Sequence, residues 1–153
     1  MGRVVAVAFG SNLGDRRAHI RWAADRVAGL LEGFRLSSII ETAPVGAGLE
    51  HDPPFLNAAA VGGSAAPARD LLDALLAIEA ARGRTRPRPG APRTLDLDLI
   101  LVGDEVIAER GLHVPHPRFR ERRFVLEPLA EVAPDLVDPV SGRIMRDLLA
   151  RLR

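Results

Sequence analysis

Short apolar runs rich in β-branched residues alternate with amphipathic segments along most of this chain. Runs of the first kind predict buried strands, and apolar positions that recur every three or four residues predict helices. We therefore expect strands at residues 3–9, 34–42, 55–62 and 93–101, with helices at 16–33 and 67–83. A turn at Gly103 and Asp104 would fold residues 105–109 back on the fourth strand as a hairpin, and helices would follow near 124–132 and 143–151.

The predicted order of strand, helix, strand, strand, helix and strand is that of the ferredoxin-like fold, or α-β plait. We predict an α+β protein in which helices cover one face of an antiparallel sheet, with an appended β-hairpin and C-terminal helices. The other face of the sheet would then be free for a site beneath the loops. Residues 1–153 are expected to form a single domain, because this length suits one buried core.

Two carboxylates interrupt the apolar pattern of the fourth strand at Asp96 and Asp98. Side chains alternate between the faces of a strand, so both should project to the same side, with their Cα atoms roughly 6 to 7 Å apart. That spacing suits a hard cation or a bridged pair of cations. A solvated strand edge would give the same pattern. An arginine cluster directly upstream favours a metal-bound polyphosphate, and it comprises Arg82, Arg84, Arg86, Arg88 and Arg93.

Composition removes several classes of protein. The formal net charge is only +1, so no bulk partner such as nucleic acid or an anionic membrane is indicated. The chain has no lysine, which excludes a Walker A loop, and no cysteine, which excludes thiolate zinc sites and a cysteine nucleophile. No apolar run is long enough to span a membrane and the first residues do not resemble a signal peptide, so we expect a cytoplasmic location.

Several segments together resemble the 6-hydroxymethyl-7,8-dihydropterin pyrophosphokinase family. The strongest is PRTLDLD at residues 92–98. The others are GSNLG at 10–14, FLNAA at 55–59, Ile78 and Glu79 with Gly83 and Arg84, and VPH at 114–116 followed by Arg122 and Phe124. They occur in the family's order along nearly the whole chain, and it is the combination that is specific.

The resemblance implies an enzyme that moves the diphosphate of ATP to a pterin alcohol in folate biosynthesis and releases AMP. It implies that Asp96 and Asp98 ligate two Mg²⁺ ions and that Arg84 and Arg93 act in catalysis beside them. The ATP-binding residues implied are Glu79, Arg84, Arg86, Arg93, Leu99, His113, His116 and Arg122. The pterin-binding residues implied are Thr42, Pro44, Val45, Phe55, Asn57, Asp96 and Phe124. From the family we expect a monomer that acts on small molecules alone.

Other interpretations of the same residues stay open. A single-stranded RNA reader on the same fold would need aromatic residues on the sheet face, where the first strand offers only Phe9. A metal-dependent phosphohydrolase could use the same aspartates. His113 and His116 have the spacing of a zinc-binding pair, but no third ligand of zinc type lies near them in the sequence. The general base is not identified, since His116, an aspartate or none could serve.

Overall fold

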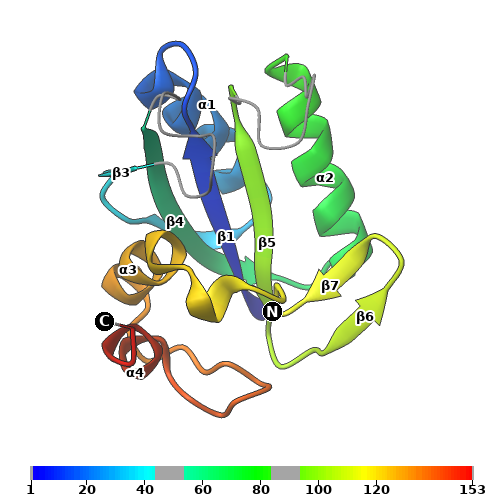
Figure 1. Cartoon of the computed structure of the whole chain (residues 1–153). Helices are drawn as coiled ribbons and strands as arrows, with labels where there is room; N and C mark the ends of the chain where they lie inside the picture. Colours follow the sequence, from blue (N-terminus) through cyan, green and yellow to red (C-terminus); the bar gives the residue numbers. More distant parts are fainter. Residues whose placement is uncertain (1, 44–53, 84–93, 153) are drawn as a thin grey trace.

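The computed structural model describes residues 2–43, 54–83 and 94–152. Its main sheet is antiparallel, in the order β2–β4–β1–β5, with β3 also paired to β4 (Figure 1). The strands are β1 (Arg3–Ser11), β2 (Glu32–Leu36), β3 (Ile40–Thr42), β4 (Phe55–Ser64) and β5 (Asp96–Val102). The two outer strands are joined to the inner pair through helices, and the predicted ferredoxin-like arrangement is confirmed.

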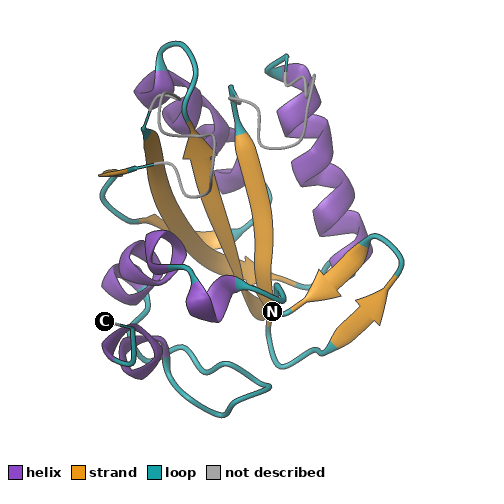
Figure 2. Ribbon diagram, in the orientation of Figure 1, coloured by secondary structure: helices purple, strands orange, loops and turns teal. Residues whose placement is uncertain are grey.

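Helices cover both faces of the sheet (Figure 2). α1 (Arg16–Ala28) and α2 (Ala68–Ala81) pack on one face through a cluster that includes Val7, Ile20 and Leu75. The short 3-10 helix η1 (Phe119–Glu121), α3 (Arg123–Val132) and α4 (Met145–Ala150) pack on the other. The prediction that this second face is free was therefore wrong for part of its length, because small residues of the sheet there accept α3 closely.

The first helix begins where the sequence predicts but ends earlier. Asp15 is the N-cap, and its side chain accepts a hydrogen bond from the Ala18 N–H at 3.1 Å. The helix stops at Ala28 with Gly29 as its C-cap, although the pattern predicted an end at Gly33. Leu31 belongs to the core from a position outside the helix, so its hydrophobicity extended the apparent period.

The predicted strand at 34–42 is two strands, because a serine side chain replaces a backbone partner between them. Ser37 donates its N–H to the Ala59 carbonyl at 2.8 Å, and its hydroxyl accepts the Ala59 N–H at 2.9 Å. One residue thus satisfies both groups of Ala59, and the ladder ends there before β3 resumes it. The next residue, Ser38, donates both its N–H and its hydroxyl to the Glu131 carboxylate of α3.

The predicted hairpin pairs different strands. β6 (Ile107–Glu109) pairs with β7 (Leu112–Val114) rather than with β5. Gly103 adopts a φ of +57° and donates its N–H to the carbonyl of Val4, which turns the chain away from the sheet edge. In the described ranges, no helix has the length and apolar character needed to cross a membrane.

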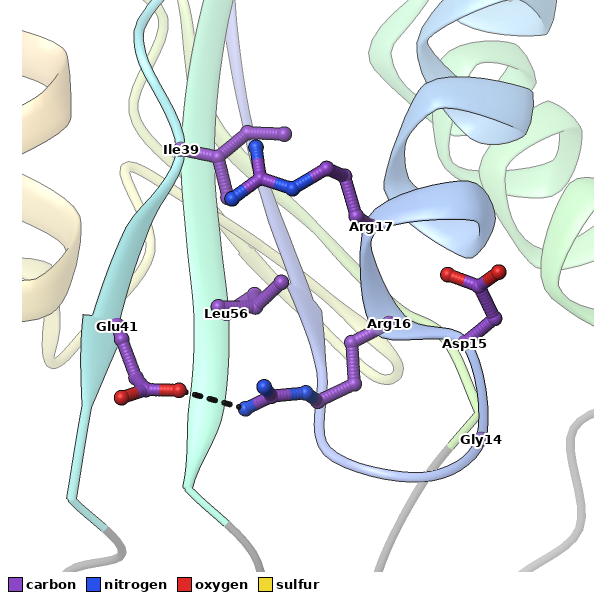
Figure 3. A pocket seen from close by; sticks show the side chains of 7 residues that line it. All are labelled: Gly14, Asp15, Arg16, Arg17, Ile39, Glu41 and Leu56. Atoms are coloured by element: carbon purple, nitrogen blue, oxygen red, sulfur yellow. Dashed lines mark hydrogen bonds and ion pairs between the residues drawn. The ribbon is translucent and has the colours of Figure 1, made fainter.

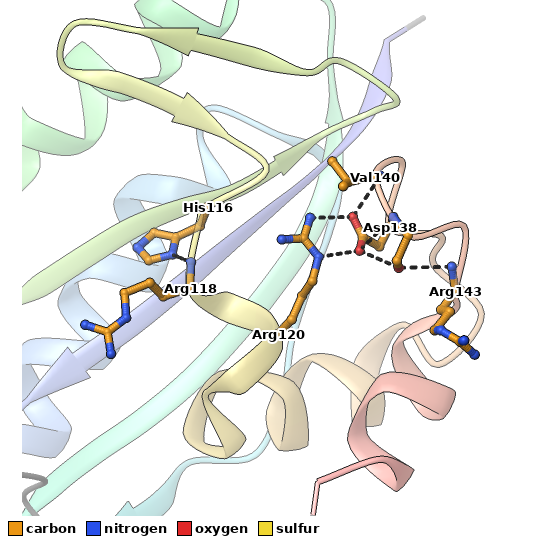
Figure 4. Close-up of polar contacts among 7 residues, drawn as sticks. His116, Arg118, Arg120, Asp138, Val140 and Arg143 are labelled. Atoms are coloured by element: carbon orange, nitrogen blue, oxygen red, sulfur yellow. Dashed lines mark hydrogen bonds and ion pairs between the residues drawn. The ribbon is translucent and has the colours of Figure 1, made fainter.

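A buried aspartate organises the segment between α3 and α4. Asp138 is fully buried and forms a bidentate pair with Arg120, while the Ser141 hydroxyl and the Val140 N–H also donate to it (Figure 4). Burial alone would raise the pKa of Asp138, but these hydrogen bonds outweigh it and lower the pKa to about 2. The pair fixes the C-terminal segment to η1, the element that leads into α3.

Because the pKa of Asp138 is lowered in the folded protein, the free energy of unfolding should depend on pH in the acid range. At pH values above 3.8, the ordinary pKa of an aspartate, the ionised Asp138 carboxylate stabilises the fold. This contribution is lost as the pH falls toward the pKa of about 2 that Asp138 has in the folded protein. The loss should be about 2 kcal/mol, because each pKa unit corresponds to about 1.4 kcal/mol. Urea unfolding at pH 6 and pH 2.5 should show a smaller acid-induced loss for Asp138→Asn than for the native chain. Equal losses in the two proteins would contradict this role.

Candidate active site

Gly10 of β1 lies between polar residues of the two neighbouring strands. Gly10 pairs with Asn57 of β4 on one side and with Asp96 of β5 on the other, so these three residues share one face of the sheet. Two residues back along β1, Ala8 pairs with Asp98. A Cβ at Gly10 would lie 3.2 Å from Asn57 Oδ1 and 3.6 Å from the Phe55 ring. Because Gly10 has no side chain, space remains above the sheet at this point and the Asn57 amide stays accessible.

A cavity of about 580 Å³ lies over this face of the sheet. Both Asp96 and Asp98 line it, as the alternation of side chains along a strand predicts. Leu97 and Leu99 point the other way, into the core beneath α1 and α2. Two carboxylates from one strand therefore enter the same cavity, and both remain partly accessible.

Aromatic and polar residues from three elements complete the cavity. Phe55 comes from β4, Phe124 from the first turn of α3, and Thr42 from the end of β3. The Asn57 amide donates to the Thr42 hydroxyl at 2.6 Å, which orients the amide plane at the cavity wall. The Arg122 guanidinium lies over the Phe124 ring, 5.7 Å from its centroid.

The rim carries charges that the sequence analysis did not assign to the site. Arg118, Glu121 and Arg123 line the cavity together with Arg122. Arg118 donates from Nε to Glu121 at 2.8 Å, and both side chains are largely exposed. The sequence did carry a signal for this charged rim, because residues 118–123, directly after the VPH segment, contain four arginines. Three of the four face the cavity, whereas Arg120 turns to Asp138.

His116 lies beside this rim in a defined tautomer. A β-bulge leaves Ile100 without a partner on β1, and the free Ile100 carbonyl accepts the His116 N–H at 2.8 Å. The imidazole Nδ1 accepts the Arg118 N–H at 3.1 Å, so the proton of the neutral ring is on Nε2 (Figure 4). Burial, and after it the Arg122 guanidinium, lower the pKa of His116, which is therefore neutral near pH 7.

Besides His116, which lies beside the rim, three predicted ATP-binding residues in the described part of the chain do not line the cavity. Leu99 is buried in the core, so any nucleotide contact would come from its backbone. His113 is exposed on β7 and pairs with Ala108 in the small hairpin. Glu79 is 3% exposed on α2, and its carboxylate accepts the Leu97 N–H at 2.6 Å. Pro44, Val45, Arg84, Arg86 and Arg93 lie outside the described residues.

A second cavity, of about 480 Å³, lies on the opposite face of β4 (Figure 3). Arg16 and Arg17 at the start of α1 line it together with Glu41 and Leu56. Arg16 is committed to an ion pair with Glu41 at 3.1 Å and to the Pro54 carbonyl at 2.8 Å. Among the described residues that line this cavity there is neither a carboxylate pair on one strand nor an aromatic ring, so we assign the chemistry to the first cavity.

The donor set of the first cavity suits magnesium better than zinc. Within residues 2–43, 54–83 and 94–152, no three His, Cys, Asp or Glu side chains form a metal-binding cluster. Zinc sites need three or four protein ligands, which His113 and His116 do not find there. Mg²⁺ is held by one or two carboxylates and completed by water and substrate phosphates, which two aspartates in an open cavity can supply.

Comparison with known proteins agrees with this arrangement. The model of the 7,8-dihydro-6-hydroxymethylpterin-pyrophosphokinase (HPPK) family matches residues 6–134. The chain belongs to the HPPK family. The 2-amino-4-hydroxy-6-hydroxymethyldihydropteridine pyrophosphokinase of Pseudomonas aeruginosa is 42% identical over 148 residues, which cover 95% of this chain and 90% of that relative. The Bacillus subtilis protein of the same name is 41% identical over 134 residues, covering 86% and 79% respectively.

Solved HPPK structures share the fold. A Plasmodium falciparum HPPK-DHPS variant with pterin and p-hydroxybenzoate superimposes with a TM-score of 0.76 at 13% identity. The alignment covers 99% of this chain but only 44% of that one, so this chain spans less than half of the Plasmodium protein. At this identity the likeness shows the HPPK fold alone.

The surroundings of His116 give a test of the site's electrostatics. Arg122 disfavours the imidazolium, so Arg122→Ala should raise the pKa of His116 toward its ordinary value of 6.5. An NMR titration of the histidine ring nitrogens would measure the shift. Arg143→Ala, in the distant C-terminal segment, should leave it unchanged. A pKa of His116 that does not move in Arg122→Ala would contradict this geometry.

Proposed function

We propose that this chain transfers the diphosphate of ATP to the hydroxymethyl group of 6-hydroxymethyl-7,8-dihydropterin and releases AMP. Membership of the HPPK family and the names of its relatives support this activity. One observation carries it at the level of residues. Asp96, Asp98, Phe55 and Phe124 come from three elements and line a single cavity. A carboxylate pair beside two aromatic rings suits a metal-bound phosphate chain that meets a flat heterocycle.

Asp96 and Asp98 are the residues proposed to hold two Mg²⁺ ions. When bound, the metal would neutralise charge on the phosphates and orient them for in-line displacement. The two side chains enter the cavity from one strand, so their separation is fixed by the backbone rather than by flexible loops. Phosphoryl transfer depends mainly on positioning and charge neutralisation, which a fixed pair supplies.

Cationic and hydrogen-bonding groups on the rim would bind the phosphates. Arg122 offers a forked guanidinium that matches a phosphate with two parallel hydrogen bonds. His116 offers one donor, Nε2–H, because its Nδ1 is already occupied by Arg118. We propose the same role for Arg84, Arg86 and Arg93 on the resemblance alone, with Arg84 and Arg93 acting at the transferred group.

The pterin would bind between Phe55 and Phe124. Offset stacking on each ring adds about 0.5 to 1.5 kcal/mol beyond area burial. The Asn57 amide has both a donor and an acceptor for the ring edge. Thr42 orients this amide by accepting a hydrogen bond from it, and the absence of a side chain at Gly10 leaves it accessible. We propose that the enzyme acts as a monomer, since the cavity is built within one chain.

The carboxylates should be essential and the product should be AMP. Asp96→Asn or Asp98→Asn is expected to lower turnover by at least about 100-fold, because several kcal/mol of charge stabilisation are lost. Chromatography of the nucleotide products would measure this with Mg²⁺, ATP and the pterin alcohol. Asp104→Asn, on the exposed turn after β5, is the matched control and should keep the native rate. ADP as the product would refute diphosphoryl transfer, and ATP turnover without pterin would favour a phosphohydrolase.

The aromatic pair should govern pterin affinity rather than ATP affinity. Phe124→Ala is expected to raise the KM for pterin about 10- to 100-fold, since stacking and burial of the ligand are both lost. Steady-state kinetics with each substrate varied in turn would separate the two effects. Phe34→Ala removes a ring that packs on the other side of the sheet and should leave the pterin KM unchanged. Equal increases for both substrates in Phe124→Ala would contradict a stacking role.

A further inference from the structure

The strand that carries both carboxylates is an edge strand of the main sheet. β5 pairs with β1 on one side, and no other strand in the described part of the chain flanks it on the other. An edge strand has backbone groups without ladder partners and bends or frays more easily than a central one. Asp96 and Asp98 lie at the beginning of this strand, where the chain enters the sheet. Their separation therefore depends on what holds the free edge straight.

Glu79 provides such a contact from α2, which runs alongside β5 (Figure 1). Its Oε2 atom accepts the backbone N–H of Leu97 at 2.6 Å, and Leu97 is the residue between the two aspartates. Leu97 is paired with Phe9 of β1, but its N–H donates to Glu79, so this N–H is used outside the β1–β5 ladder. The Glu79 carboxylate thus takes the place that a carbonyl of a further strand would have.

The burial of Glu79 shows that the contact is specific. Glu79 is 3% exposed, and a carboxylate is rarely buried so deeply unless it forms hydrogen bonds. Leu75, one turn earlier on α2, and Leu97 itself belong to the core beside it. A charge-assisted hydrogen bond in this environment is shorter and stronger than a neutral one.

We propose that Glu79 is a positioning residue for the Asp96–Asp98 pair, which it holds in register by fixing the Leu97 N–H between them. This inference rests on the proposed function, because it takes the two aspartates as ligands of metal-bound ATP. It assigns Glu79 a role through the backbone of β5 in place of direct contact with the nucleotide. What this role requires of the side chain is an acceptor oxygen for the Leu97 N–H.

Two substitutions separate the acceptor from the charge. Glu79→Gln keeps an acceptor oxygen and removes the charge, and Glu79→Met keeps the volume and removes the acceptor. We would measure the dissociation constant of Mn²⁺ in the presence of α,β-methylene-ATP by calorimetry, and the exchange rate of the Leu97 amide by NMR. Glu79→Met should weaken Mn²⁺ binding about tenfold, the lower end for loss of a supporting contact at a metal site. Glu79→Gln should stay within about threefold of the native affinity.

The outcomes are distinct. Native Mn²⁺ affinity in Glu79→Met, or equal weakening in both variants, would overturn the positioning role. If Glu79→Met does not fold, the Leu97 amide of the native protein still decides, because rapid exchange there would show that the contact is not maintained. The binding measurements need neither pterin nor turnover. A native protein that binds Mn²⁺ and nucleotide but forms no AMP would refute the proposed function and leave the test of Glu79 intact.

Discussion

The position of β1 between β4 and β5 decides what this face of the sheet can bind. Its antiparallel register places Gly10 between Asn57 and Asp96, and Ala8 beside Asp98. A larger residue at Gly10 would crowd the Asn57 amide and the Phe55 ring, and a larger one at Ala8 would extend into the cavity that Ala8 lines. The cavity is therefore a consequence of pairing register and of two small side chains, before any loop is considered.

Along the first part of β5, one face of the strand packs in the core and the other lines the cavity. Leu97 and Leu99 bury themselves beneath α1 and α2, while Asp96 and Asp98 alternate to the opposite face. The bulge at Ile100 then breaks this alternation, so that Ile100 and Leu101 both pack toward α3 and α4. One strand thus changes from a half-polar to a fully buried element within its length, and its freed carbonyl holds His116.

The C-terminal segment closes the site from outside the plait. Arg120 and Asp138 fix η1, which leads directly to Arg122 and to Phe124 at the start of α3. The ion pair between partly buried Arg120 and buried Asp138 therefore orders the neighbouring residues that line the cavity, although neither partner lines it. The arginines of this region divide between the two tasks, since Arg118, Arg122 and Arg123 line the cavity and Arg120 serves the fold.

The sequence by itself determined the order of the main elements, the starts of the first two helices near residues 16 and 67, and the shared face of Asp96 and Asp98, because these follow from local period and backbone chemistry. Its motifs also indicated the family. Only the tertiary structure decided the early end of α1, the break at Ser37, the pairing of β6 with β7, and the burial of Glu79 and Leu99 away from the cavity. The break at Ser37 depends on Ala59 across the sheet, and the burial of Glu79 depends on the Leu97 backbone beside α2, both distant in the chain. Periodicity records which residues avoid water, but it does not record which distant group satisfies a given hydrogen bond.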